Sequence, residues 1–410
     1  MFDAIIVGAR CAGAATAMLL ARAGHKVLLV DKARFPSDIP HGHFIHWEGP
    51  RCLQRFGLLD RVVASNCPPI TDCVSHQGDY LLRASDLMVD GVAWAYGPRR
   101  KVVDQLLIDA AIEAGAEFQD ALSVDEFLAD EGQVVGIRGR RNGAPIEARA
   151  PLTIGADGRN SPLARFVSAP EYHTAPPLTC YYFSYWRDVP HAPFETYRLG
   201  RRVIFAHSTN DDLFAVFAGW PVREHAELRS DLDGAFWRTL ELAPDFAARV
   251  RSGRRVEPLY GAINLPNFFR KPYGPGWALV GDAGYHKDPY LAHGVSDALR
   301  DAEILSLAVH RGLSGAQPMQ EALAEYQRRR DASALPQYQR NLQLANLEAP
   351  VSTDFLAIRA AVRDDPLETR RYTLALFGLT RPDEFFNPQN VERLLARLDG
   401  HGGRARSGAA

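Results

Sequence analysis

The stretch AIIVGARCAGAATAMLLARAGHKVLLVD, residues 4 to 31, decides the fold of this chain. Ala4 to Val7 is a short apolar run typical of a buried strand, and Ala12 to Ala23 is rich in small residues that favour a helix. Gly24 ends the helix, and Val27 to Val30 is a second strand without polar alternation. This order predicts the opening βαβ unit of a parallel, doubly wound sheet.

The turn between the first strand and the helix predicts a dinucleotide site. Glycines there let the backbone approach a pyrophosphate at the helix N-terminus, where unpaired N–H groups and the helix dipole favour anions. Asp31 ends the second strand, where an acid accepts a hydrogen bond from a ribose hydroxyl. Arg10 replaces the middle glycine of the usual fingerprint, and the alternative is a purely structural turn. The predicted cofactor contacts are Gly8, Arg10, Ala12, Gly13, Asp31 and Lys32.

Composition narrows the classes of function. The chain has 410 residues, with 47 Lys+Arg against 49 Asp+Glu, and this balance gives no global attraction for nucleic acid or an anionic membrane. Five cysteines without a CxxC pair argue against a disulfide framework and favour the cytoplasm. Arg10, Arg22 and Lys26 interrupt the apolar N-terminal stretch, so we expect neither a signal peptide nor a transmembrane helix.

Further along the chain, the pattern alternates between this fold and a second kind of sheet. Lys101 to Ala114 has helical spacing, and Gln133 to Arg149 predicts a hairpin that turns at Asn142-Gly143. Residues 70–96 and 178–263 are predicted to form antiparallel strands. The aromatic run from Tyr181 to Trp186 has two faces: either both pack into the core, or one packs into the core and the other forms the wall of a substrate site. Helices are expected from Val295 and from Gln320.

Two more motifs follow in order. The first is Ile154-Gly155-Ala156-Asp157-Gly158-Arg159-Asn160-Ser161, and the second is Trp277-Ala278-Leu279-Val280-Gly281-Asp282-Ala283 with Pro289 and Gly294 downstream. With the first glycine turn they resemble the Asp-Gly and Gly-Asp motifs of the flavoprotein aromatic hydroxylases, the para-hydroxybenzoate hydroxylase family of the glutathione-reductase-like group. The resemblance spans residues 1 to about 345, and three ordered motifs are far more specific than one.

The resemblance implies an FAD site. Asp282 is expected to accept a hydrogen bond from a ribityl hydroxyl, and Asp157 to support the FAD-binding backbone. Arg100 resembles the arginine that contacts FAD from its helix. The segment from Pro289 to Gly294, with Ala292 inside it, should present N–H groups to the flavin, where a positive helix end stabilises the charge of a reduced flavin.

The expected catalytic residues are histidines and a tyrosine on the substrate side of the flavin. His43, Tyr285, His286 and His293 are the candidates, with His43 or His286 as general base. The spacing of His41, His43 and His46 also raises a metal site, but no Cys or carboxylate completes a ligand shell, so no metal is predicted. A plain exposed loop is the other interpretation. The Arg328-Arg329-Arg330 triplet reads as a solvated helix face, and Cys11 as a packing residue.

We therefore expect an α/β chain with a glutathione-reductase-type, Rossmann-like FAD fold, an inserted antiparallel substrate domain and a helical C-terminal segment. The predicted FAD domain is 1–70, 97–177 and 264–345; the substrate domain is 71–96 and 178–263; helices fill 346–399, and 400–410 is a disordered tail. The implied reaction is oxygenation of a small aromatic substrate with NADH or NADPH and dioxygen, through a C4a-hydroperoxyflavin. Alternatives are a reductase of the geranylgeranyl-reductase type and a catalytically silent flavoprotein.

Overall fold

The computed structural model describes residues 1–39, 41–190 and 193–406, and the chain divides into two compact units. The first unit comprises Met1–Ser65, Pro98–Pro177 and Leu265–Ala345; the second comprises Asn66–Gly97, Leu178–Asn264 and Asn346–Ala410. Each unit is thus assembled from three separate segments. No helix in these described ranges is long and apolar enough to cross a membrane.

The first unit is built on a parallel sheet. Its main strands and helices are β1 (Ala4–Val7), α1 (Cys11–Arg22), β2 (Val27–Val30), β3 (Ile45–His46), α2 (Gly49–Arg55), α3 (Leu59–Ala64), α4 (Arg100–Glu113), β10 (Glu117–Gln119), β11 (Leu122–Asp130), β12 (Gln133–Arg141), β13 (Ala144–Arg149), β14 (Leu152–Gly155), α5 (Pro162–Phe166), β15 (Glu171–Ala175), β22 (Asn267–Arg270), β23 (Tyr273–Gly274), β24 (Trp277–Leu279), β25 (Tyr285–His286), α9 (Gly294–Leu313) and α10 (Met319–Ala345). The predicted fold class is confirmed.

The order of strands brings the three sequence motifs to one edge of this sheet. The order is β10-β2-β1-β14-β24-β23, and Ala4 of β1 lies opposite both Val27 and Leu152 in parallel register. A motif follows each of the adjacent strands β1, β14 and β24. Because parallel strands end at the same edge, their three turns meet there, the usual place for a ligand in such sheets.

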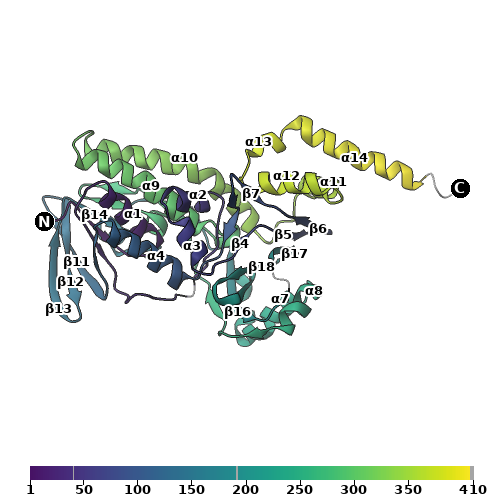
Figure 1. Ribbon diagram of the computed structural model, residues 1–410, viewed down its shortest axis with the longest axis horizontal. Coiled ribbons are helices and arrows are strands. Elements are labelled where there is room, and N and C mark those ends of the chain that lie inside the picture. The colour runs from purple at the N-terminus through teal and green to yellow at the C-terminus, as the bar shows by residue number, and fades with distance from the viewer. Residues whose placement is uncertain (40, 191–192, 407–410) are drawn as a thin grey trace. The chain divides into compact units, whose positions relative to one another are not determined.

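Helices and a small sheet cover the two faces of the parallel sheet. Helix α1 packs beside α4 and α9, and α9 packs against α10 (Figure 1). The other face carries the antiparallel sheet β11-β12-β13, seen near the N-terminus in Figure 1. Apolar side chains of the two sheets form one buried cluster, which includes Ile5, Val7, Leu28, Val30, Leu122, Phe127, Ile137 and Leu279. This three-layer packing holds the motif edge in place.

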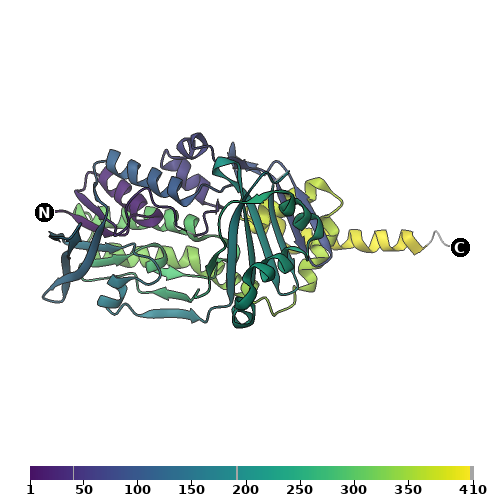
Figure 2. The ribbon, with the colours of Figure 1, turned by 90° about the horizontal axis from the view of Figure 1, so that it is seen from below.

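The second unit is built on a mainly antiparallel sheet. Its main elements are β4 (Pro69–Ile70), β5 (Cys73–Gln77), β6 (Tyr80–Ala84), β7 (Met88–Val89), β8 (Val92–Ala93), β9 (Ala95–Tyr96), β16 (Thr179–Arg187), β17 (Phe194–Leu199), β18 (Arg202–Thr209), β19 (Leu213–Pro221), α6 (His225–Leu228), α7 (Leu232–Leu240), α8 (Pro244–Ser252), β20 (Arg254–Arg255), β21 (Tyr260–Ala262), α11 (Thr353–Val362), α12 (Pro366–Leu376), α13 (Pro382–Phe385) and α14 (Pro388–Arg406). Its strands run in the order β20-β16-β19-β18-β17-β5-β6, in which only β17 and β5 of the described strands pair in parallel. Figure 2 shows strands of this sheet side by side.

Both faces of the aromatic strand β16 are buried within the second unit. Tyr182 and Trp186 belong to one cluster with Phe236 and Phe246 of α7 and α8, while Phe183 and Tyr185 belong to another on the opposite face. The aromatic residues of this strand therefore serve as core on each side.

The C-terminal helices belong to the second unit. Leu82 of β6 is in one cluster with side chains of α11, α12 and α14. Arg359 is fully buried, and its guanidinium donates to the carbonyls of Ser75 (2.6 Å) and Tyr80 (3.0 Å) in the β5–β6 hairpin. Helix α14 runs to Arg406, past Gly400, where the sequence predicts a disordered tail; residues 407–410 lie outside the described residues.

Arg330 corrects the prediction of a solvated arginine triplet. Arg328 and Arg329 are exposed, but Arg330 is fully buried because it follows Tyr326 by one helical turn on the inner face of α10. Its guanidinium donates to the hydroxyl of Tyr172 and to two backbone carbonyls. Arg330 thus lies on the buried face of α10, whereas Arg328 and Arg329 lie on its exposed face.

Candidate functional site

The glycine turn after β1 is shaped by close backbone approach. Gly8 has φ of 105°, and a β carbon there would lie 2.3 Å from the carbonyl oxygen of Ala156, which follows β14. A β carbon on Gly13 would lie 1.8 Å from the carbonyl oxygen of Gly8. Both positions therefore require glycine, and the turn leads directly into α1. Arg10 is the N-cap of α1, and within the described residues no side chain caps this N-terminus.

Asp31 fixes the glycine turn through its carboxylate. One oxygen accepts from the backbone N–H of Ala9 (2.8 Å) and the other from that of Ala33 (2.8 Å). A carboxylate has further lone pairs, so a ribose hydroxyl can still donate to it. Lys32 is exposed beside it, and Ala12 lies in the first turn of α1. The contacts of these residues with a cofactor stay predictions.

A residue that sequence analysis missed holds both predicted arginines. Asp104 on α4 is fully buried, and its carboxylate accepts from Arg10 (2.8 Å) and from Arg100 (2.9 Å). The thiol of Cys11 also donates to it (3.2 Å), and burial raises the pKa of that thiol to about 12, so Cys11 is a neutral packing residue. The available signal was the spacing of Arg100 and Asp104, one helical turn apart.

The Gly-Asp turn packs on the first turn of α1. Gly281 begins the short helix Gly281–Ala283 with φ of 62°, and a β carbon there would lie 2.8 Å from the β carbon of Ala12. The next residue, Asp282, is exposed, so its carboxylate is open to a ligand. Asp157, in contrast, is half-buried: its carboxylate accepts from the N–H of Leu163 (3.2 Å), and burial raises its pKa. Asp157 thus holds the backbone that follows its own motif.

The segment before α9 is a partly exposed turn held by hydrogen bonds. Ala292 has left-handed backbone (φ 51°, ψ 30°), a conformation that glycine adopts more readily than alanine. Asn341 of α10 holds the turn: its amide oxygen accepts from the N–H of Leu291 (3.0 Å), and its amide nitrogen donates to the carbonyl of Asp288 (2.8 Å). Pro289 and Gly294 are exposed on either side. Asn341 is a second residue that sequence analysis missed.

The loop of three histidines is bonded to this same turn. The His46 Nε2–H donates to the carbonyl of Leu291 (2.8 Å), and the hydroxyl of Ser296 donates to the carbonyl of His46 (2.6 Å). His41 is exposed, whereas His43 and His46 are buried, so the interpretation as a wholly exposed loop is wrong. No group of three or more potential ligand side chains in the described ranges is arranged to hold a metal.

His293 is enclosed by aromatic rings at the N-terminus of α9. Its ring lies 4.8 Å from the His46 ring and 4.7 Å from the Trp47 ring, between centroids. Burial lowers the pKa of His46 to about 4 and holds the pKa of His293 well below 6.5, so both imidazoles are neutral at pH 7. The His293 Nδ1 is buried without a hydrogen-bond partner among the described residues. This atom is therefore available to a ligand.

Tyr285 and His286 lie within their own unit's core. The Tyr285 ring stacks on Phe269 (4.8 Å between centroids), and its hydroxyl accepts from Arg300 (2.9 Å). The His286 Nδ1–H donates to the carbonyl of Pro266 (2.5 Å). The structure gives both side chains packing roles, and a role for either at a flavin stays a prediction.

A buried ionic network links the first turns of α9 to Lys287. Asp297 accepts from Lys287 (2.5 Å) and from Arg300 (2.8 Å), which also pairs with Asp301. Although burial alone would raise the pKa of Asp297, Lys287 and Arg300 hold it below its ordinary value. The network keeps buried charges of both signs paired at the start of α9, and no feature of the sequence pattern had indicated it.

These observations fit an FAD site. Two helix N-termini, α1 and α9, lack side-chain caps in the described part of the chain, and the glycine turn leaves room for close backbone approach. Arg10, Arg100 and exposed Asp282 supply the charges that a pyrophosphate and a ribityl chain require. The fold and site define a dinucleotide-binding protein of the Rossmann type.

Comparison with known proteins identifies the dinucleotide. The family model described as "FAD binding domain" matches residues 1–227. The chain belongs to this family of FAD-dependent oxidoreductases, and the predicted resemblance is confirmed. A curated relative, the digeranylgeranylglycerophospholipid reductase of Methanocella arvoryzae, is 26% identical over 333 residues, which cover 79% of this chain and 81% of the relative.

Two solved structures share the fold. The myxobacterial chondrochloren halogenase CndH, an FAD-dependent halogenase, has a TM-score of 0.78 with 18% identity, and the match covers 96% of this chain and 95% of CndH. PqsL of Pseudomonas aeruginosa, named a probable FAD-dependent monooxygenase, has a TM-score of 0.69 with 20% identity. The match covers 91% of this chain and 99% of PqsL. The family and these similarities indicate an FAD-dependent enzyme.

Proposed function

We propose that this protein is an FAD-dependent monooxygenase that uses NADH or NADPH and dioxygen to hydroxylate a small, electron-rich aromatic molecule. The balanced reaction consumes the substrate, dioxygen, the reduced nicotinamide and a proton, and releases the hydroxylated product, the oxidised nicotinamide and water. The observation that carries the proposal is the neutral ring wall of His46, Trp47 and His293 beside the turn before α9.

Different residues of the first unit would bind different parts of FAD. The N-terminus of α1, with Arg10 and Arg100, would hold the pyrophosphate, and Asp282 would accept from the ribityl chain. The N-terminus of α9 would stabilise negative charge on the flavin pyrimidine edge. Bound FAD would supply the redox chemistry, accepting a hydride from the nicotinamide and passing electrons to dioxygen.

The neutral ring wall matches what oxygen transfer requires. Reactive oxygen species on the path to product are lost when water or an acid reaches them, so the site must be dry and free of acidic groups. The imidazoles of His46 and His293 are buried and uncharged at pH 7, so they meet both conditions. The partnerless Nδ1 of His293 would accept a hydrogen bond from the hydroxyl of a phenolic substrate. His43, also buried, is the candidate base.

The nicotinamide would bind only transiently. Within the described residues there is one parallel sheet of the dinucleotide-binding type, and FAD occupies its motif edge in this proposal. The reduced nicotinamide would therefore approach the first unit without a fold of its own. PqsL has been solved with 2-aminobenzoylacetate, which supports a small aromatic ligand for proteins of this fold.

The decisive experiment follows oxygen from the gas into product. Purified holoprotein is given NADPH or NADH, isotopically labelled dioxygen and a panel of phenols and aromatic amines. We expect one compound to accelerate nicotinamide oxidation and to carry the label. A His293→Asn variant should keep its flavin and lose most of this product, while His310→Asn, an exposed histidine on the same helix, should match the native protein. Peroxide as the sole oxygen product with every compound would contradict the proposal.

A second candidate is an alkene reductase. The similarity to digeranylgeranylglycerophospholipid reductase over most of the chain favours it. Its test is anaerobic: reduced holoprotein would be reoxidised by a polyprenyl lipid without dioxygen. Flavin-containing protein that oxidises neither nicotinamide under any of these conditions would instead support a catalytically silent flavoprotein.

A further inference from the structure

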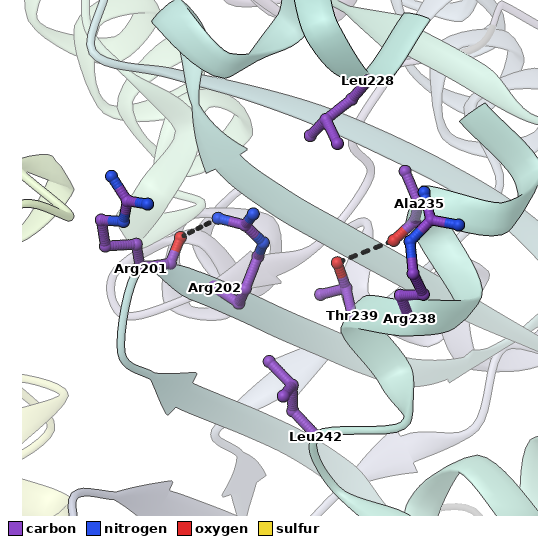
Figure 3. Close-up of a pocket in the computed structure, with 7 residues that line it drawn as sticks. All are labelled: Arg201, Arg202, Leu228, Ala235, Arg238, Thr239 and Leu242. Atoms are coloured by element: carbon purple, nitrogen blue, oxygen red, sulfur yellow. Dashed lines mark hydrogen bonds between the residues drawn. The ribbon is translucent and has the colours of Figure 1, made fainter. Parts of the chain in front are cut away.

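The second unit contains a cavity that the proposed reaction does not use. Its volume is about 370 Å³, and it lies between the turn that joins β17 to β18 and the helices α6 and α7 (Figure 3). The lining residues are Arg201, Arg202, Leu228, Ala235, Arg238, Thr239 and Leu242. A cavity of this size is at the lower end of the range for small-molecule sites, roughly 300–1,000 Å³. All of the FAD-site residues, in contrast, belong to the first unit.

Three arginines give the cavity a net positive charge. Arg201 and Arg202 both pair with Glu224 (3.1 and 2.7 Å), and Arg238 pairs with Asp231 (2.8 Å). Two carboxylates thus face three guanidiniums, and one positive charge remains uncompensated. Each guanidinium carries five N–H donors, of which these ion pairs and one bond to a backbone carbonyl use only a part. The cavity therefore has both the charge and the donors to hold one anionic group.

The remaining lining is apolar. Leu228 and Leu242 lie at opposite sides of the cavity (Figure 3). Arg201 and Arg202 lie on a third side, and Arg238 lies on the side facing them, with Ala235 and Thr239 of α7. Leu242 is 50% exposed, so its side chain offers apolar surface to a ligand. The Thr239 hydroxyl donates to the carbonyl of Ala235 within the helix, so this side of the wall presents little polar surface.

From this combination of charge and apolar wall, we propose that the cavity binds a small organic anion, a carboxylate or phosphate ester with an apolar body. The anionic group lies among Arg201, Arg202 and Arg238, and the apolar body lies against Leu228 and Leu242. The site is independent of the proposed oxygenation, because it shares no residue with the FAD motifs. Failure of one proposal therefore leaves the other intact.

The test uses holoprotein and the fluorescent anion 8-anilinonaphthalene-1-sulfonate, an aromatic body with one sulfonate. We expect saturable binding that decanoate displaces and that weakens with added salt. Arg238→Glu should weaken binding about tenfold, which corresponds to about 1.4 kcal/mol. Arg251→Glu is the matched control: this arginine is 52% exposed on α8, also pairs with a carboxylate, and lies outside the cavity, so its variant should bind as the native protein does.

A charge-neutralising variant separates ligand binding from structural support. Glu224→Gln removes a negative charge from the cavity, so it should tighten probe binding several-fold. If Glu224 instead served only to hold the arginines, this variant would weaken binding as Arg238→Glu does, and the proposal would fail. Displacement of the probe by inorganic phosphate at the same concentration as decanoate would also overturn it, since that result requires no apolar wall. Unchanged flavin content in each variant confirms that the first unit is intact.

Discussion

Replacing Asp104 by asparagine tests the charge balance beneath the pyrophosphate turn. The change keeps the shape of the side chain but removes the only carboxylate shown to accept from both Arg10 and Arg100 among the described residues. Breaking a buried ion pair by removing one partner costs about 3–5 kcal/mol. Because the side chain of Arg10 is 25% exposed and can regain water, we expect the lower value, about 3 kcal/mol, for the apoprotein.

The assay compares the free energy of unfolding with and without FAD. The apoprotein is unfolded with urea and followed by far-ultraviolet circular dichroism, and the titration is repeated with excess FAD. The FAD pyrophosphate would bring negative charge beside the two arginines, so FAD should stabilise Asp104→Asn more than it stabilises the native protein. If FAD stabilises Asp104→Asn no more than it stabilises the native protein, the pyrophosphate does not bind beside these arginines.

Glu113→Gln is the matched control on the same helix. Glu113 pairs with Arg61 at 2.6 Å, but both side chains are about half exposed, so its loss should leave the unfolding midpoint unchanged. If Asp104→Asn and Glu113→Gln unfold at the same urea concentration, the buried carboxylate does not hold the turn and the reasoning is refuted.

Three further outcomes follow from the site. Asp282→Ala should fold normally and lose flavin, because the side chain is exposed; unchanged flavin absorbance after purification would contradict its role. Gly294→Ala should also fold, because no atom lies within 4 Å of the new β carbon, but it should bind FAD weakly. Gly13→Ala should instead destabilise the protein itself, because its β carbon would lie 1.8 Å from the Gly8 carbonyl oxygen. Calorimetry of the two apoproteins distinguishes these results. His46 is neutral in the native state to a pH of about 4 and takes up a proton near 6.5 when unfolded, so its contribution to stability is complete above about pH 6.5 and is lost as the pH falls towards 4. His46→Gln should flatten the fall in unfolding free energy between about pH 7 and 5, and equal slopes would count against this pKa.

The sequence was most informative where backbone geometry leaves one choice of residue. Gly8 and Gly13 are required by contacts of 2.3 and 1.8 Å, so a glycine pattern between two apolar runs predicts the turn reliably. The adjacent strands β1, β14 and β24 then place all three motifs at one edge of the sheet. Apolar runs and turn glycines are visible in a single sequence. Together they predict the parallel strands at whose ends the motifs lie.

Partners that are distant in sequence could not be predicted in the same way. Asp104 meets Arg10 across 94 residues, and Asn341 meets Asp288 across 53, and neither pairing leaves a periodic signal. Arg330 appeared solvated because a triplet of arginines is usually exposed, yet its position on the helix turns it inward. Buried polar groups are specified by where three-dimensional packing places a partner, which a pattern of hydrophobicity does not record.

The three-part assembly of the second unit sets the order in which this protein can fold. Leu82 and the β5–β6 hairpin are synthesised early, but the helices that bury Leu82 and the Arg359 side chain that holds the hairpin carbonyls are made after the whole first unit. During translation, the side chain of Leu82 on β6 therefore lacks its apolar cover until those helices are made. The first unit has all three of its segments once Ala345 has left the ribosome, whereas the second unit can be completed only afterwards. A nascent chain arrested shortly after residue 345 should accordingly be competent to bind FAD and still be a target for chaperones.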